Sequence, residues 1–255
     1  MIDSHCHLEQ KEYDKIRDEV IEKCRKKLKA IITCCAHPKD FDLTLNLAKK
    51  YKNFIFSTVG IHPIYIEKLN KEKVRKIFEK IKEKKDEICA IGEVGLDYYS
   101  TKEEKLRKKQ REVFVEFINL AKEIKKPIVV HARDAFSNAI KILEKNHAEK
   151  VLMHLFGDKD LVGKVNENDW YISVGPILLR SKKHKKIVKR MPLEKILLET
   201  DSPWFPINDE IGYPWNVEFV AKKIAEIKKV DVKEVEKITD ENAIKFFDLK
   251  LNSIP

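Results

Sequence analysis

Short runs of apolar and β-branched residues recur along the chain, and a longer polar stretch with helical spacing of its apolar positions follows each of them. The runs are continuously apolar, which is typical of strands buried on both faces of a parallel sheet. The clearest helical stripe comprises Val113, Phe117, Leu120, Ala121 and Ile124. The predicted strands cover residues 1–4, 30–35, 54–60, 88–94, 127–130, 151–155, 170–174 and 195–199.

An eightfold alternation of strand and helix predicts one closed α/β barrel. A (β/α)8 TIM barrel takes about 250 residues, and this chain has 255 residues without a segment typical of a linker. We therefore expect a single barrel domain over residues 1–255. The alternative is an open doubly wound sheet, which usually has a glycine-rich phosphate loop after its first strand. Here the first strand is followed by Ser4-His5-Cys6-His7 instead.

The residues after the last predicted strand indicate two further helices. A proline-rich stretch covers residues 203–214, and helical patterns follow over residues 215–229 and 232–248. Asp231 directly precedes the second pattern, where its side chain can accept a hydrogen bond from a backbone N–H of the first helical turn. We therefore expect Asp231 to be an N-cap.

The chain is basic, with a formal net charge of +10 and a pI near 9.1. An excess of positive charge favours an anionic partner such as nucleic acid, although lysine-rich helix faces in contact with water give the same balance. Charged residues make up 37% of the chain and are spread along it rather than gathered in a tail, which indicates a globular protein.

Neither the cysteines nor the first residues indicate secretion. The five cysteines include no Cys-x-x-Cys pair, which argues against a disulfide framework and a thiolate zinc site. Residues 1–8 lack the basic and apolar segments of a signal peptide, and no apolar run approaches the roughly 20 residues that span a bilayer. We therefore expect a cytoplasmic protein without a membrane partner.

Metal-binding side chains gather at the carboxyl ends of five predicted strands, which form the mouth of a barrel. His5 and His7 alternate along an extended chain, so both imidazoles share one face. Six such groups, buried together without cations, would each cost several kcal/mol in desolvation and repulsion. The set therefore predicts a metal centre, whereas each residue alone is equally explained as structural. The six residues are His5, His7, Glu93, His131, His154 and Asp201.

These residues belong to segments that resemble the TatD-type metal-dependent deoxyribonucleases of the amidohydrolase superfamily. The resemblance spans nearly the whole chain in the order of the family. The segments are IDSHCHL at residues 2–8, GIHP at 60–63, AIGEVGLDYY at 90–99, QREVF at 110–114, HARDA at 131–135 and LETDSP at 198–203.

The resemblance implies a barrel of the metal-dependent hydrolase type with two adjacent divalent ions, Zn²⁺, Mg²⁺ or Mn²⁺. It assigns His5, His7 and Asp201 to the first ion, His131 and His154 to the second, and Glu93 to both. A related amidohydrolase branch bridges its metals with a carboxylated lysine. Glu93 occupies the equivalent place here, which favours the TatD-like branch.

The implied activity is hydrolysis of DNA phosphodiester bonds, starting from a single strand or duplex end, by a water molecule that two metals activate. Asp201 would orient or deprotonate this water, so Asp201 and Glu93 are the catalytic candidates. His62 and Arg133 are candidates for binding the phosphate. The alternatives are that His62 only structures the turn before Pro63 and that Arg133 pairs with Asp134 or Asp97.

Further residues near the expected mouth have weaker assignments. We expect Asp97 to orient a metal ligand. Tyr98, Tyr99 and Trp204 are candidates for stacking on bases, and the alternative is that they only pack within their loops. The basic residues 180–186 would follow a nucleic-acid backbone or be an exposed helix. No obligatory protein partner is expected. His37, His147 and His184 lie outside every matched segment and receive no role.

Two segments depart from the family pattern and weaken the assignment of DNA as the substrate. The residues after His154 differ from the usual sequence, and residues 213–217 replace an Arg-Asn-Glu-Pro-like segment expected to face the substrate. Two alternatives therefore stay open. The same metal site hydrolyses another ester or an amide, such as an aminoacyl-tRNA ester or a cyclic amide, or the barrel binds nucleic acid without catalysis.

Overall fold

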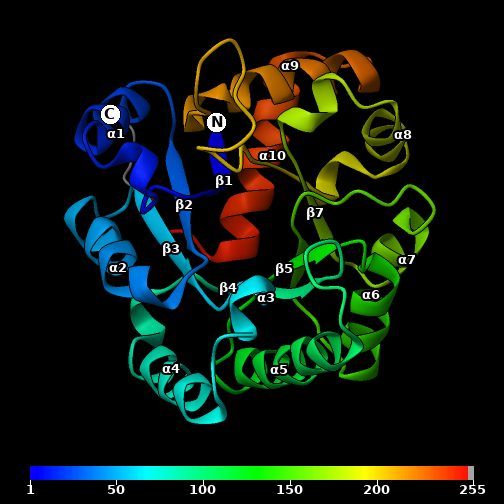
Figure 1. Cartoon of the computed structure of the whole chain (residues 1–255). Coiled ribbons are helices and arrows are strands. Elements are labelled where there is room, and N and C mark those ends of the chain that lie inside the picture. Colours follow the sequence, from blue (N-terminus) through cyan, green and yellow to red (C-terminus); the bar gives the residue numbers. More distant parts are fainter. Residues whose placement is uncertain (252–255) are drawn as a thin grey trace.

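The computed structural model describes residues 1–251 as a ring of parallel strands surrounded by helices (Figure 1). Neighbouring strands pair in chain order from β1 to β8, which confirms the predicted (β/α)8 barrel. An open doubly wound sheet would reverse its strand order, and this alternative is wrong. The strands are β1 (Ile2–Cys6), β2 (Ala30–Cys35), β3 (Ile55–Val59), β4 (Ala90–Asp97), β5 (Ile128–Arg133), β6 (Val151–Met153), β7 (Tyr171–Val174) and β8 (Ile196–Leu198).

Helices form the outer layer of the barrel (Figure 1). Their apolar faces pack on the strands in a continuous core. No helix within residues 1–251 is both long and apolar enough to cross a membrane. The helices are α1 (Arg17–Arg25), α2 (Phe41–Lys50), α3 (Pro63–Ile66), α4 (Lys71–Glu83), α5 (Glu104–Glu123), α6 (Phe136–Lys145), α7 (Val162–Glu167), α8 (Lys182–Arg190), α9 (Val217–Lys228) and α10 (Val232–Phe247).

The two predicted C-terminal helices correspond to α9 and α10. Asp231 caps α10 as expected, because its side chain accepts a hydrogen bond from the backbone N–H of Lys233 at 2.7 Å. Ala243 and Phe246 of α10 pack with Ile2 and Ala30 at the amino-terminal ends of the strands. Helix α10 therefore closes the end of the barrel opposite the carboxyl ends of the strands.

Several strands extend beyond the predicted ends, into residues with polar side chains. β4 continues to Asp97 rather than Val94, and β5 continues to Arg133 rather than Val130. The prediction ended each strand where the apolar run ended. The parallel pairing continues because backbone groups, not side chains, form it, so Gly95 still pairs with His131.

Gly95 brings β4 unusually close to β5. Its φ is 138°, and a Cβ atom there would lie 2.2 Å from the backbone oxygen of His131. Only glycine accepts both this backbone conformation and this separation. The close approach sets the positions of Glu93 and His131 relative to each other.

A seam between the first and last strands closes the ring. Asp201, beyond the end of β8, donates its backbone N–H to the oxygen of His5 at 2.9 Å, and His7, just after β1, donates to the oxygen of Ser202 at 2.7 Å. Within the seam, the hydroxyl of Thr200 donates to the buried carboxylate of Asp3 at 2.5 Å. These contacts hold His5, His7 and Asp201 side by side.

Candidate metal centre

The six predicted ligands meet at the carboxyl ends of the strands. His5 lies in β1 and Glu93 in β4, so these two side chains project from within strands rather than after them. His154 directly follows β6, and Asp201 lies three residues after the end of β8. All six except His131, which is half-buried, are almost inaccessible to solvent.

One group of ligand atoms forms around Nε2 of His5 and His7, which lie 3.2 Å apart. Oδ1 of Asp201 lies 3.2 Å from Nε2 of His7 and 3.7 Å from Nε2 of His5. Oε2 of Glu93 completes the group at 3.6 Å from Nε2 of His5. These are the residues that the resemblance assigns to the first ion.

A second group forms around the other oxygen of the same glutamate. Oε1 of Glu93 lies 2.6 Å from Nδ1 of His131 and 3.6 Å from Nε2 of His154. Nε2 of His62 lies 3.8 Å from this oxygen. Glu93 therefore presents one oxygen to each group.

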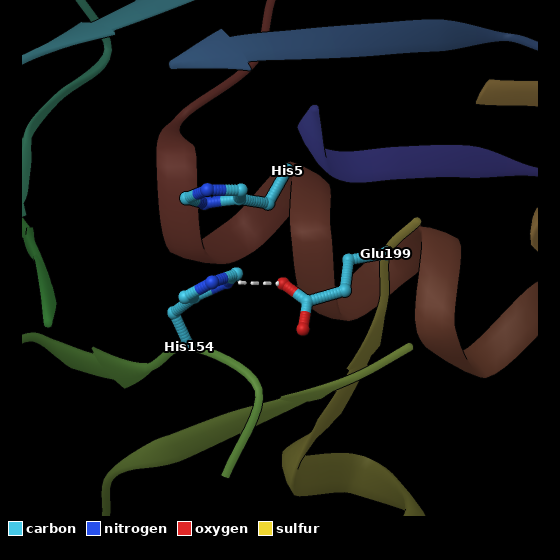
Figure 2. A group of neighbouring side chains, drawn as sticks. All are labelled: His5, His154 and Glu199. Carbon is cyan, nitrogen blue, oxygen red and sulfur yellow. Dashed lines mark hydrogen bonds and ion pairs between the residues drawn. The ribbon is translucent and has the colours of Figure 1, made fainter. Parts of the chain in front are cut away.

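Acceptors behind the imidazoles fix which ring nitrogen faces the centre. Nδ1 of His154 donates to Oε2 of Glu199 at 2.7 Å (Figure 2), and the ring stacks on His5 with centroids 3.8 Å apart. Nδ1 of His7 lies 2.8 Å from the backbone oxygen of Cys34 and 3.1 Å from Oε1 of Glu9. With the proton on Nδ1, the lone pair of Nε2 points into the centre, as a metal ligand requires.

Glu9 and Glu199 were missed in the sequence analysis as parts of the site. Both are fully buried, and each continues an alternating pattern, Glu9 after His5 and His7, and Glu199 before Asp201. Such alternation places side chains on one face of an extended chain. This alternation is the feature of the sequence from which Glu9 and Glu199 could have been assigned to the site.

The structure places Asp97 behind His131, as expected. Oδ2 of Asp97 lies 3.4 Å from Nε2 of His131, and Ser100 donates its backbone N–H to Oδ1 at 2.7 Å. The buried side chain of Gln110 accepts from the backbone N–H of Asp97 at 3.0 Å and donates to Thr101 at 2.9 Å. Helix α5 thus supports the end of β4.

Charges within the centre compensate one another. Burial alone would raise the pKa of Glu93 and of Asp201, but the surrounding imidazoles hold the pKa of both carboxyl groups below their usual values. For His154, burial alone would lower the pKa, but the carboxylates of Glu199, Glu93 and Asp201 raise it to about 9. The carboxylates that favour protonated imidazoles also attract a divalent cation, which replaces the protons when it binds.

The donor set fits divalent metals. His5, His7 and Glu93 offer three ligand atoms that lie within 4.8 Å of one another. Glu93, His131 and His154 offer a second such set. Imidazole nitrogens suit Zn²⁺, and carboxylate oxygens suit Mg²⁺ and Mn²⁺. The residues present therefore suit a metal centre with Glu93 between its two halves.

The two predicted phosphate-binding residues both line the cavity above the centre, which has a volume of about 580 Å³. His62 lies 3.3 Å from His131 and also caps α3 by accepting from the backbone N–H of Ile64 at 3.3 Å. Arg133 is exposed and stacks 3.7 Å above the ring of Tyr99. Within the described residues, Arg133 forms no ion pair with Asp134 or Asp97.

The aromatic residues expected to stack on bases do not all reach the mouth. Trp204 is 43% exposed and lies 4.5 Å from the ring of His7, and Tyr99 is 53% exposed. Tyr98 is buried instead, with its hydroxyl hydrogen-bonded to Arg111 and Asn138. The expectation for Tyr98 is therefore wrong, because helices α5 and α6 hold it.

The expectation that residues 213–217 face the substrate is also wrong. Tyr213 stacks on the buried ring of Trp215 with centroids 4.4 Å apart, and the ammonium group of Lys23 lies 4.1 Å from the ring of Trp215. These contacts hold the segment against α1, and none of its residues lines the cavity.

Comparisons with known proteins identify the family of this chain. The family model described as TatD related DNase matches residues 2–248. The chain is 35% identical to Deoxyribonuclease TATDN3 of Homo sapiens over 97% of this chain and 94% of that protein. It is 38% identical to an uncharacterized metal-dependent hydrolase of Methanocaldococcus jannaschii over 98% of both.

A solved structure shares the fold of this chain at low sequence identity. The crystal structure of YJJV, a TatD homolog from Escherichia coli, has a TM-score of 0.90, 22% identity and coverage of 98% of both chains. The family match extends over nearly all of the barrel. This chain therefore belongs to the TatD-related DNase family and is a metal-dependent hydrolase acting on ester bonds.

Proposed function

We propose that this protein hydrolyses phosphodiester bonds of DNA, with a water molecule activated by two divalent cations, and that it removes nucleotides from a strand end. The observation that carries the proposal is the orientation of Glu93. One of its oxygens faces His5 and His7, and the other faces His131 and His154. A carboxylate in this position is suited to bridging two cations.

The residues of the centre would have distinct roles. His5, His7 and Asp201 would hold one cation, His131 and His154 the other, and Glu93 both. Bound divalent cations lower the pKa of water and stabilise negative charge on phosphoryl oxygens.

Asp201 is our candidate base, because its Oδ1 lies between His5, His7 and His154 at 3.2 to 3.8 Å and its carboxylate stays ionised. Asp201 thus lies at the centre and has an ionised carboxylate that can accept a proton from the attacking water.

Substrate binding would use the exposed residues of the same cavity. Arg133 offers a planar fork of N–H donors that matches two phosphate oxygens, and its stacking on Tyr99 restricts its motion. The exposed ring of Trp204 offers a face for a base. A cavity of about 580 Å³ admits a few nucleotides of single strand rather than a duplex, which supports attack from an end. The name of the human relative supports DNA as the substrate.

The test uses protein stripped of metal with a chelator and resupplied with Mg²⁺, Mn²⁺ or Zn²⁺. We expect metal-dependent shortening of end-labelled single-stranded DNA, and loss of more than about a hundredfold in rate for Glu93→Ala, because a bridging ligand is removed. Glu116→Ala is the matched control, since Glu116 is exposed on α5 and makes no charged contact within residues 1–251.

Three results would contradict the proposal in different ways. No cleavage with any metal, despite stoichiometric metal binding, would favour the hydrolysis of another ester or of an amide, such as an aminoacyl-tRNA ester or a cyclic amide. DNA binding with no hydrolysis of any kind would indicate a binding protein. Cleavage at internal positions of circular single-stranded DNA would overturn the attack from an end.

A further inference from the structure

The amino-terminal end of α8 opens into the same cavity as the metal centre. Lys183 and His184, from the first turn of this helix, line the cavity together with His154 and Gly157. Ser181 is the N-cap of α8, and its hydroxyl accepts from the backbone N–H of His184 at 3.3 Å. Neither Lys183 nor His184 has a role in the hydrolysis proposed above.

The imidazole of His184 is held in one orientation. It is only 8% exposed, and its Nδ1 lies 2.8 Å from the hydroxyl oxygen of Ser181. This oxygen already accepts a backbone N–H, so its own hydrogen is available for Nδ1. Burial and the charge of Lys183 lower the pKa of His184 to about 4. The ring is therefore neutral near pH 7, and when the hydroxyl of Ser181 donates to Nδ1 the ring carries its proton on Nε2.

The hydrogen bonds of His184 within residues 1–251 involve its backbone N–H and Nδ1, and Nε2 takes part in none of them. Space for an acceptor lies beside Gly157, where a Cβ atom would come within 3.4 Å of Nε2. The geometry leaves room for a ligand that accepts hydrogen bonds.

The charges around this donor favour an anion. Lys183 is exposed and forms no ion pair in the described part of the chain, and the end of α8 adds a partial positive charge. Asp158 lines an adjoining hollow that Lys183 also borders, and Asp134 lines both this hollow and the cavity of the metal centre. Their carboxylates repel an anion, which confines it to the side of His184.

We propose that Lys183 and His184 form a second phosphate subsite, which binds a phosphate group of the DNA other than the one that is attacked. This inference rests on the proposed phosphodiesterase function. The second phosphate is either the neighbouring diester or a terminal phosphate monoester. In both, oxygens accept from Nε2–H of His184 and pair with the ammonium group of Lys183.

Short substrates with different numbers of phosphates test the subsite. Thymidylyl-thymidine has one phosphodiester, its 5′-phosphorylated form adds a terminal phosphate, and the unphosphorylated trinucleotide adds a second diester. We expect Lys183→Ala to lower kcat/KM about tenfold on a substrate that fills the subsite, because one charge-assisted hydrogen bond is lost. The same variant should leave thymidylyl-thymidine unchanged, and the substrate that responds identifies the kind of phosphate bound.

Gly157→Ala tests the donor without changing a charge. The added methyl group would meet Nε2 of His184 at 3.4 Å and Phe136 at 3.5 Å, which are ordinary contacts, so the protein should fold normally. The methyl group would occupy the place of the phosphate oxygen and cause the same selective loss. Gly163→Ala is the matched control, because a Cβ atom there approaches nothing nearer than Glu167 at 4.0 Å.

Different results separate the failure of the subsite from the failure of the proposed function. Equal losses on all three substrates, or no loss on any, would overturn the subsite while phosphodiester hydrolysis stands. If no substrate is hydrolysed, the proposed function fails, and fluorescence anisotropy with the labelled 5′-phosphorylated trinucleotide decides the subsite. Weaker binding in Lys183→Ala and Gly157→Ala, but not in Gly163→Ala, would support it, and equal binding in all three would reject it.

Discussion

Glu199 and Glu9 act on the metal centre through the imidazoles that they contact. Glu199 accepts from His154 with one oxygen and from the backbone N–H of Leu155 with the other, at 2.7 and 2.9 Å. Glu9 shares Nδ1 of His7 with the backbone oxygen of Cys34. His154 therefore depends on one acceptor, whereas His7 has two.

This difference predicts unequal effects of removing the two charges. Glu199→Gln keeps the size of the side chain but has one acceptor oxygen for two donors, so we expect metal affinity to fall about 10- to 100-fold. Glu9→Gln should cost less, because Cys34 still orients His7. Titration calorimetry with Zn²⁺ or Mn²⁺ measures both affinities, and circular dichroism checks the fold. An equal loss in the two variants would contradict this account.

At the scale of residues, the sequence predicted the groups that face the centre and placed Asp97 behind one of them, but it did not indicate Glu9 and Glu199. His5 and His7 stand out because they alternate directly after an apolar run. The alternation of Glu199 with Asp201 could have placed Glu199 at the centre, but its contact with His154, 45 positions earlier in the chain, has no local signature. Burial of Tyr98 similarly depends on contacts from α5 and α6.

Strand β4 tolerates little change at Gly95. Alanine at this position would need a φ of 138° and would place its Cβ 2.2 Å from the oxygen of His131. We expect Gly95→Ala to lower the free energy of unfolding by more than about 3 kcal/mol, because two strands must separate. Urea denaturation followed by circular dichroism measures this loss. Gly163→Ala in α7 is the control, and a similar stability of the two variants would show that β4 and β5 can move apart.

At the scale of elements, the sequence located every strand and missed several ends. Apolar runs identify the buried middle of a strand, as for residues 88–94 within β4. They do not report how far pairing continues through polar residues such as Asp97. Asp231 was recognised as a cap because capping depends on neighbouring residues alone.

For the whole molecule, metal binding should raise stability. A ligand that binds only the folded state at about 100 times its Kd adds about 2.7 kcal/mol, and the centre joins β1, β4, β5, β6 and β8. We therefore expect removal of metal by a chelator to lower Tm by several degrees. Scanning calorimetry measures the shift. The chelator should lower the Tm of Glu93→Ala much less. If the chelator leaves the Tm of the wild-type protein unchanged, the protein has no metal centre that spans the barrel.

The overall architecture was the most predictable level, because eight repeats of strand and helix leave few alternatives. Closure of the ring was less accessible to prediction. It depends on Thr200 and Asp3, which are 197 positions apart, and on backbone hydrogen bonds from residues just beyond the strands. Neither feature has a signature in the local sequence.

The seam between β1 and β8 also determines when the centre can form during protein synthesis. The ribosome releases His5 and His7 early, but these residues receive Asp201 and Ser202 as partners only after almost 200 further residues have been translated. A nascent chain therefore lacks a complete set of ligands until late in translation. Truncated products, which a cell makes whenever translation stops early, would lack Asp201 and with it a complete centre.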